Sequence, residues 1–318
     1  MIEIFDIKHA VENISGFVHR TPLLSSQTIN SFTGKTIWFK AECFQKTGSF
    51  KVRGAANKIK PLAGKIGGVI TISSGNHGQA TAYVAGKVGL PAVIMVPEGT
   101  SQPKIDAAKY YGAEVIIGGD LNNIDPLIER AFALAAERKL EPVHPFDDAA
   151  IVAGQGTVGL EIVEDLPEVD IVVVPVGGGG LLSGVAVAIK SLCPSARVYG
   201  VGPVNASSMY ESFRTGKMVN LHEMPQTIAD GIRTPLVGQL TLEHTLKYVD
   251  DVVTVSDGEI IDALKLVWSR LKVFAEPSGA SSLAAIQSGK LPIGSSQRVV
   301  AILSGGNVDL SKLSKLLK

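Results

Sequence analysis

The feature that most constrains the fold is a series of short runs rich in valine and isoleucine, each followed by a turn. The runs do not alternate apolar and polar residues, so we expect strands buried on both faces, as in parallel sheets. Segments with helical spacing separate them, the clearest being residues 125–139, and residues 259–273 also predict an amphipathic helix. This alternation predicts an α/β fold built from doubly wound open sheets. The expected strands are residues 68–74, 92–98, 114–118, 170–176, 197–201 and 298–304.

Loop residues cluster at two places, 61–67 and 142–148. Between them lie about three strand–helix units, enough for a small domain of their own. We therefore expect a small domain at residues 67–145, inserted into a large domain made of residues 1–66 and 146–318.

Composition excludes several classes of protein. The 318 residues include 30 Lys and Arg against 30 Asp and Glu, which argues against a nucleic-acid partner. No apolar stretch reaches the roughly 20 residues of a spanning helix, and residues 1–10 do not resemble a signal peptide, so we expect no membrane partner. The two cysteines form no CxxC pair and predict a cytoplasmic location. The scattered histidines predict no metal site.

Lys51 stands in the segment KTGSFKVRG (46–54), just after Phe50 and at the expected start of a helix. Partial burial beside the aromatic ring would lower the pKa of its amine and make it nucleophilic toward carbonyl groups. A solvated lysine on a helix surface is the alternative interpretation of this segment taken alone.

Three further polar loops follow expected strands, at the strand ends where open α/β sheets bind ligands. The first is SSGNHG (73–78), which is either an anion site at a helix start or an ordinary N-cap. The second is GGGGLLSG (177–184), whose four glycines expose several N–H groups to one anion. The third is SGGNVD (304–309), which is polar and rich in glycine. Together they suggest one ligand held by several strand ends.

In this order, the four segments resemble the fold-type II pyridoxal-phosphate enzymes, in particular the serine/threonine dehydratases and serine racemases. HRTPL (19–23), IADGI (228–232) and AEPSGA (275–280) are also similar to segments of that family. The resemblance runs from about His19 to Asp309. It implies two open sheets, the smaller domain inserted in the larger, and pyridoxal 5'-phosphate as the cofactor.

The resemblance also implies roles for individual residues. Lys51 would bind the cofactor covalently and then remove the Cα proton of the substrate. Asn76 would contact the 3-hydroxyl of the cofactor ring, and Ser304 would face the pyridine nitrogen. The phosphate would be held by Gly177, Gly178, Gly179, Gly180 and Leu181, the ring would be flanked by Phe50 and Gly231, and the substrate carboxylate would be received by Ser73, Ser74, Gly75 and His77.

The implied activity is dehydration of a β-hydroxy L-amino acid, such as threonine, serine or phenylserine, to a 2-keto acid and ammonia. Ser74 leaves a serine or aspartate racemase as the alternative, because family racemases carry a serine here as the second acid/base. A non-catalytic anion-binding protein and a dinucleotide-dependent oxidoreductase are weaker alternatives. Thr234 and residues 154–157 are candidates for the substrate pocket or for packing at helix starts.

Two departures from the family pattern matter. The acidic residues of divalent-metal-activated members would fall on Gly202 and Ser208, which supply no carboxylate. The chain ends at Lys318, without room for a C-terminal effector domain, so feedback control by isoleucine is not expected. A homodimer is expected from the resemblance.

Overall fold

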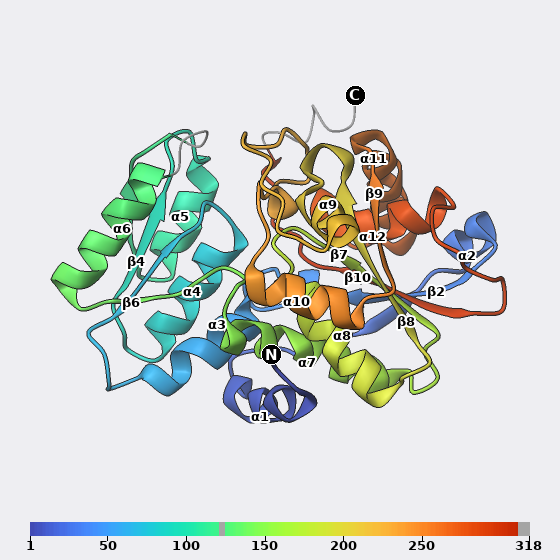
Figure 1. The fold of residues 1–318 in the computed structure, drawn as a ribbon, viewed down its shortest axis with the longest axis horizontal. Coiled ribbons are helices and arrows are strands. Elements are labelled where there is room, and N and C mark those ends of the chain that lie inside the picture. Colours follow the sequence, from blue (N-terminus) through green and yellow to red (C-terminus); the bar gives the residue numbers. More distant parts are fainter. Residues whose placement is uncertain (121–124, 311–318) are drawn as a thin grey trace.

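Two open sheets with helices on both faces form the protein, as the sequence predicted (Figure 1). The computed structural model describes residues 1–120 and 125–310. The larger sheet has the strand order β1–β2–β10–β7–β8–β9, and only the β1–β2 pair is antiparallel. Its strands are β1 (Leu23–Ser25), β2 (Thr36–Ala41), β7 (Ile171–Pro175), β8 (Arg197–Pro203), β9 (Asp251–Val255) and β10 (Arg298–Leu303).

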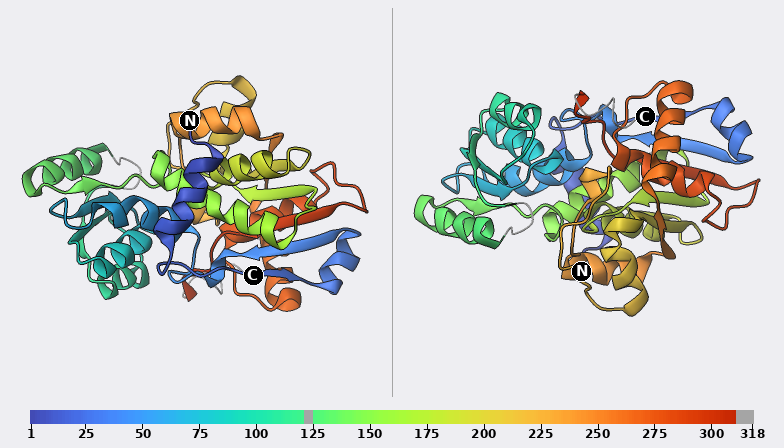
Figure 2. Two further views of the ribbon diagram at one scale, coloured as in Figure 1. Left: turned by 90° about the horizontal axis from the view of Figure 1, so that it is seen from below. Right: turned by 90° about the horizontal axis from the view of Figure 1, so that it is seen from above.

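The smaller sheet is entirely parallel and has the order β5–β4–β3–β6. Its strands are β3 (Val69–Ile72), β4 (Ala92–Val96), β5 (Glu114–Ile117) and β6 (Glu141–Pro142). It forms the separate lobe on the left of Figure 1, and Figure 2 shows the two lobes from below and above. All four strands lie within residues 67–145. The division into two domains and its boundaries stay a prediction.

The helices cover both faces of each sheet. Within the described residues they are α1 (Ile4–Ile14), α2 (Gln27–Thr33), α3 (Lys51–Ile59), α4 (Asn76–Lys87), α5 (Gln102–Tyr110), α6 (Asp125–Arg138), α7 (Ala149–Asp165), α8 (Gly180–Leu192), α9 (Ser208–Thr215), α10 (Gln239–Tyr248), α11 (Asp257–Leu266) and α12 (Pro277–Gln287). None of the described helices is long and apolar enough to span a membrane.

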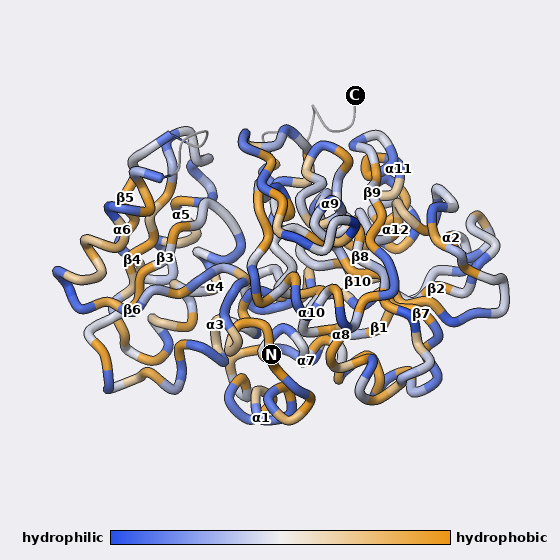
Figure 3. Tube along the Cα trace, in the orientation of Figure 1, coloured by the Kyte–Doolittle hydropathy of each residue, from blue (hydrophilic) through white to orange (hydrophobic). Residues whose placement is uncertain are grey.

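Alternate residues of a strand face different helices, which is why the strand sequences are continuously apolar. In β7, Val173 packs in a cluster with residues of α11 and α12, whereas Val172 packs in a cluster with residues of α8. In β4, Ile94 packs with α4, whereas Val93 packs with α6. Apolar residues accordingly follow the strands through the interior of both lobes (Figure 3).

One predicted helix differs in the structure. The sequence predicts a helix over residues 259–273, but α11 ends at Leu266 and a π-helical segment, Val267–Leu271, follows. In this wider turn the Trp268 indole donates to the Ala275 carbonyl at 2.9 Å and stacks on Phe274. The chain then continues to Glu276 and Pro277, which line the cavity described below.

Candidate active site

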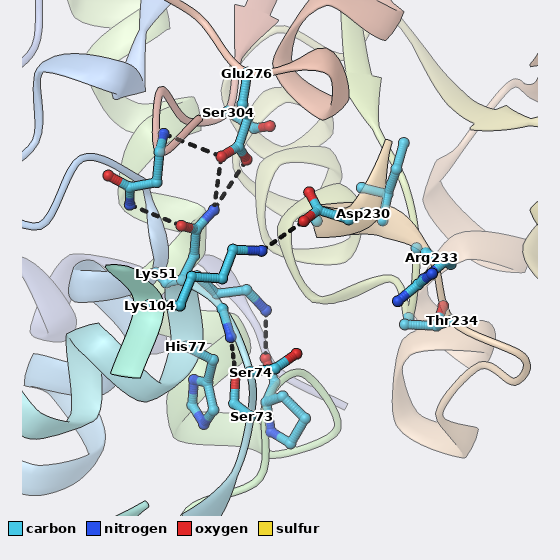
Figure 4. A pocket seen from close by; sticks show the side chains of 18 of the residues that line it. Lys51, Ser73, Ser74, His77, Lys104, Asp230, Arg233, Thr234, Glu276 and Ser304 are labelled. Carbon is cyan, nitrogen blue, oxygen red and sulfur yellow. Dashed lines mark hydrogen bonds and ion pairs between the residues drawn. The ribbon is translucent and has the colours of Figure 1, made fainter. Parts of the chain in front are cut away.

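A cavity of about 640 Å³ lies between the two sheets, at the carboxyl ends of β3, β7 and β10. Its lining combines all four segments singled out in the sequence. Every predicted site residue contributes to that lining, namely Phe50, Lys51, Ser73, Ser74, Gly75, Asn76, His77, Gly177, Gly178, Gly179, Gly180, Leu181, Gly231 and Ser304. Figure 4 shows the cavity with ten of its lining residues labelled.

Lys51 is the first residue of α3, and its side chain is partly buried. Its Nζ donates to the Pro145 carbonyl at 2.7 Å and lies 5.2 Å from the centre of the Phe50 ring. Burial lowers the pKa of Lys51 to about 8, against an opposing effect of the Glu276 charge. The structure therefore favours the interpretation of Lys51 as a nucleophilic amine over that of a solvated lysine.

A buried ionic network fixes the start of α3. The Arg53 guanidinium, fully buried, donates to both carboxylate oxygens of Glu42 at 2.8 Å and to Glu161 at 2.7 Å. Removing one member of such a network would leave an unpaired buried charge, which is strongly unfavourable. Lys51, two residues before Arg53, is held in place by this network.

The glycine loop joins β7 to α8 and is enclosed by side chains. A Cβ atom on Gly178 would overlap the Phe146 ring, and one on Gly177 would lie 3.0 Å from the Ile232 backbone. Gly179 has a φ of +99°, in the left-handed region that favours glycine. Within the described residues, the N–H groups of residues 177–181 meet no hydrogen-bond acceptor. Four glycines thus present free donors at the start of a 13-residue helix, an arrangement that binds anions.

The β3–α4 loop forms a second group of donors on the opposite lobe. Gly75 donates its N–H to Ser73 Oγ at 3.3 Å, and the N–H groups of Asn76 and His77 meet no acceptor within the described residues. The His77 ring is turned away into the protein, where Nε2 donates to the Val143 carbonyl at 3.1 Å. Burial, and secondly the Lys51 charge, lower the pKa of His77 to about 3. The ring is therefore neutral, and His77 can contribute only its backbone N–H to a carboxylate.

Three predicted contacts of the cofactor ring, Ser304, Phe50 and Gly231, line the cavity. Ser304 is 3% exposed at the end of β10, and its carbonyl accepts the Phe50 N–H at 3.1 Å. Gly231 donates its N–H to Ser278 Oγ at 2.9 Å. Ser304, Phe50 and Gly231 thus reach the cavity from three separate segments of the chain.

The sequence prediction missed Glu276, which lies buried beside Asn76. Asn76 Nδ2 donates to the Glu276 carboxylate at 2.9 and 3.2 Å (Figure 4). Burial, with Asp230 as a further contribution, raises the pKa of Glu276 to about 7. The only signal for this residue is its place in the segment AEPSGA, which the resemblance had singled out as a whole.

Four other lining residues were also missed or left open. Lys104 of α5 forms an ion pair with Asp230 at 2.5 Å, which joins the two lobes across the cavity (Figure 4). Arg233 and Thr234 line the cavity beyond Asp230. Residues 154–157, by contrast, lie inside α7, where a Cβ atom on Gly154 would come within 2.6 Å of Gly54 Cα. Residues 154–157 therefore belong to the packing of α7 against α3.

The two positions that depart from the metal-activated pattern lie on β8 and at the start of α9. Gly202 belongs to β8, and Ser208 donates its hydroxyl to the Thr234 carbonyl at 3.1 Å. Among residues 1–120 and 125–310, no group of three or more His, Cys, Asp or Glu is arranged to hold a metal ion.

Comparison with known families agrees with this geometry. Residues 14–305 match the model of the family described as pyridoxal-phosphate dependent enzyme. The chain belongs to that family, so the protein is an enzyme with pyridoxal 5'-phosphate as its cofactor. This decides against a non-catalytic anion-binding protein and against a dinucleotide-dependent oxidoreductase.

Relatives with two different activities are similar to this chain. It is 43% identical to the L-threonine ammonia-lyase of Thermotoga maritima, over the whole chain and 78% of that protein. It is 42% identical to the serine racemase of Rattus norvegicus, over 98% of the chain and 95% of that protein. The solved structure of maize serine racemase superimposes with a TM-score of 0.92 at 40% identity, covering 98% of this chain and 96% of that one.

The residues of the cavity fit the cofactor. Its phosphate needs several donors without a side chain in the way, and the Gly177–Gly180 loop offers free N–H groups in a space that Cβ atoms would fill. Its aldehyde needs a neutral amine, and the lowered pKa of Lys51 increases the neutral fraction. The donor set thus matches both ends of the cofactor.

Proposed function

We propose that this protein is a dehydratase that converts a β-hydroxy L-amino acid, such as threonine, serine or phenylserine, to a 2-keto acid and ammonia. The observation that carries the proposal is the joint placement of a partly buried lysine amine and two groups of free N–H donors around one cavity. The similarity to an L-threonine ammonia-lyase supports it.

We assign separate tasks to the chain's own residues. The glycine loop and Leu181 would hold the cofactor phosphate, with Phe50 and Gly231 beside the ring, Asn76 at its hydroxyl and Ser304 at its nitrogen. The loop from Ser73 to His77 would bind the substrate carboxylate. Bound pyridoxal phosphate supplies an electron sink that makes the Cα proton of an amino acid acidic.

Lys51 would then take the Cα proton at Nζ as general base. The Cα proton and the β-hydroxyl leave together as one water molecule, and hydrolysis of the dehydrated amino acid consumes one water and releases the keto acid and ammonia. The partly enclosed position of Lys51 keeps its amine away from bulk water before the proton transfer.

Racemisation is the second candidate, and Ser74 is the observation that favours it. Ser74 follows β3 of the smaller sheet, whereas Lys51 follows β2 of the larger, so the two side chains reach the cavity from different lobes. A hydroxyl there could return a proton to the face of Cα that Lys51 does not serve. The similarity to serine racemases supports this candidate equally.

Product analysis tests the proposal. Purified, cofactor-loaded protein is incubated with L-threonine, L-serine or phenylserine, and the keto acid and ammonia are measured. We expect equal amounts of the two products from at least one substrate, and no product from the Lys51→Ala variant. Absence of keto acid with all three substrates would contradict the dehydratase proposal.

We further propose a cytoplasmic homodimer. Cys43 and Cys193 are both free thiols, which supports a reducing compartment. The dimer is proposed from the family resemblance and from the prevalence of two-fold symmetric oligomers. Light scattering of the cofactor-loaded protein would give about twice the chain mass of 33.4 kDa.

A further inference from the structure

A chain of hydrogen bonds beside the cavity links Thr47, Asn307, Asn76 and Glu276. Asn307 Nδ2 donates to the Thr47 carbonyl at 2.8 Å and to Asn76 Oδ1 at 2.7 Å. Asn76 Nδ2 donates in turn to Glu276, at 2.9 Å to Oε1 and 3.2 Å to Oε2. The Asn307 backbone N–H donates to Glu276 Oε2 at 3.2 Å and closes the network (dashed lines at Glu276 in Figure 4).

The two ends of this chain fix the orientation of both amides. The Thr47 carbonyl can only accept a hydrogen bond, so Asn307 must present its nitrogen there. Both hydrogens of that nitrogen are then used, one on Thr47 and one on Asn76. Asn76 must therefore receive Asn307 with its oxygen and turn its own nitrogen toward Glu276. An ionised carboxylate, which only accepts, matches that nitrogen.

One N–H of Asn76 remains available after this accounting. The two oxygens of one carboxylate subtend a much smaller angle at Nδ2 than the two N–H bonds of an amide, so a single N–H serves both contacts. The second N–H has no acceptor within the described residues, and Asn76 lines the cavity. Asn76 consequently offers the cavity a donor.

Three glycines pack closely against this network, which has room only because they lack a Cβ atom. Cβ atoms on Gly305 and Gly231 would lie 2.8 and 3.0 Å from Glu276 Oε1, and a Cβ on Gly48 would overlap the Asn307 side chain. Glu276 is only 3% exposed. An enclosed carboxylate with little access to water cannot exchange its partners for solvent, so its contact with Asn76 is persistent.

We propose that Glu276 and Asn307 are positioning residues that hold the Asn76 amide with a free N–H toward the bound cofactor, so that the site favours the deprotonated form of the ring 3-oxygen. A donor stabilises an oxygen anion and disfavours the hydroxyl, which would itself need an acceptor. This inference rests on the family's cofactor and on the contact proposed for Asn76, and it does not depend on which substrate is used.

The test is the visible absorbance of cofactor-loaded protein without substrate, recorded from pH 6 to 9, because protonation of the ring oxygen changes that spectrum. In Asn307→Asp the shape is retained, but the carboxylate can donate neither to Thr47 nor to Asn76. We expect the ratio of the long- to the short-wavelength band to fall roughly 3- to 10-fold. Glu276→Ala should show a fall of the same size, and Glu276→Gln, which keeps an acceptor oxygen, should restore part of it.

Thr47→Val is the matched control. It changes a buried side chain whose hydroxyl has no partner within the described residues, and it retains the Thr47 backbone carbonyl through which this residue takes part in the network. Its spectrum should equal that of the parent protein. The charges that face Glu276 from neighbouring elements are Lys51 of α3, Lys104 of α5 and Asp230, and all are retained in these variants.

Unchanged spectra of Asn307→Asp and Glu276→Gln in folded, loaded protein would overturn the inference. A change in Thr47→Val as large as that in Asn307→Asp would also overturn it, because it would reveal general loosening of the site. Thermal unfolding of each variant identifies failure to fold, and Asn307→Asp remains the decisive variant if Glu276→Ala does not fold. If the parent protein makes no keto acid but the variants still change the spectrum as expected, the proposed function fails and this inference stands.

Discussion

The β7–α8 and β3–α4 connections have the same strand-to-helix architecture but present different groups to the cavity. Each leads from a buried parallel strand to a helix whose first N–H groups are free within the described residues. In the first, Phe146 and Ile232 fill the space around the glycines. In the second, a Cβ atom on Gly75 would meet nothing within 4 Å, and serine and asparagine side chains line the cavity.

This contrast suggests a division of labour between the lobes. A closed cradle made of backbone N–H groups suits a phosphate that stays bound, since any side chain there would occupy its place. An open loop with hydroxyl and amide groups suits a substrate that enters and leaves at each turnover. The predictions below test that division.

Lys51→Ala should have the largest effect, because we propose Lys51 both as the attachment point of the cofactor and as the general base. We expect kcat/KM to fall by roughly 10⁴-fold, with loss of covalently held cofactor seen by mass spectrometry. Lys104→Ala, which removes another cationic side chain of the same cavity, is the control and should keep the cofactor. A Lys51→Ala enzyme within tenfold of the parent would refute the role of Lys51.

The pH dependence of cofactor uptake by Lys51 should be the next largest effect. Burial lowers its pKa to about 8 from 10.5, which raises the neutral fraction at pH 7 roughly 300-fold. Because the neutral amine is the reactive form, the uptake rate of cofactor-free protein should rise with pH and level off above about pH 8. A rate that still rises beyond pH 10 would show an ordinary lysine.

Ser74→Ala should change the reaction outcome more than its rate. If Ser74 is the second acid/base, racemisation of serine should fall roughly 100-fold, while elimination changes less than about fivefold. Chiral chromatography and keto-acid formation measure the two activities in parallel. Ser73→Ala, which removes the neighbouring hydroxyl, should leave their ratio unchanged; equal loss of both activities in Ser74→Ala would remove the case for a racemase.

Adding one methyl group to each loop compares the two connections directly. Gly178→Ala places a Cβ into the Phe146 ring, an overpacking that costs about 1–3 kcal/mol, so cofactor affinity should weaken roughly 10- to 100-fold. Gly75→Ala meets open space and should change cofactor affinity less than about threefold. Equilibrium dialysis measures both, and equal losses would contradict the division between the loops.

The ion pair between Lys104 and Asp230 should contribute least. Asp230 is 41% exposed at its side chain, so solvent screens the pair and its loss should raise KM by at most about fivefold. Added salt should raise KM in the parent protein and not in Lys104→Ala. Arg138→Ala removes a surface ion pair with Glu114 on the same lobe and should leave KM and its salt dependence unchanged.

Much of the fold could be predicted from sequence because its central strands are continuously apolar. The expected strands correspond to β3, β4, β5, β7, β8 and β10. β2 was not predicted because it carries Lys40, and lysine is rarely buried. In the structure Lys40 is fully buried, with its Nζ paired with Glu161 at 2.7 Å and donating to the Thr21 carbonyl at 2.6 Å. β6 has two residues, too few for any periodic pattern.

The candidate site shows the same limit. Loops at strand ends could be identified one by one, since each carries its own glycines and polar residues. The partnership of Asn76 with Glu276 joins residues 200 positions apart, and no local spacing reports it. The orientation of the His77 ring also depends on a distant partner, the Val143 carbonyl.

Proton NMR of the cofactor-loaded enzyme with L-serine or L-threonine in heavy water tests the central claim most directly. We predict loss of the Cα proton signal of the substrate together with growth of a 2-keto acid. Deuterium at Cα of serine that persists, with accumulation of the D-enantiomer, would instead identify a racemase. Retention of the Cα proton in both substrates, with the cofactor in place, would contradict proton removal by Lys51 from this class of amino acid.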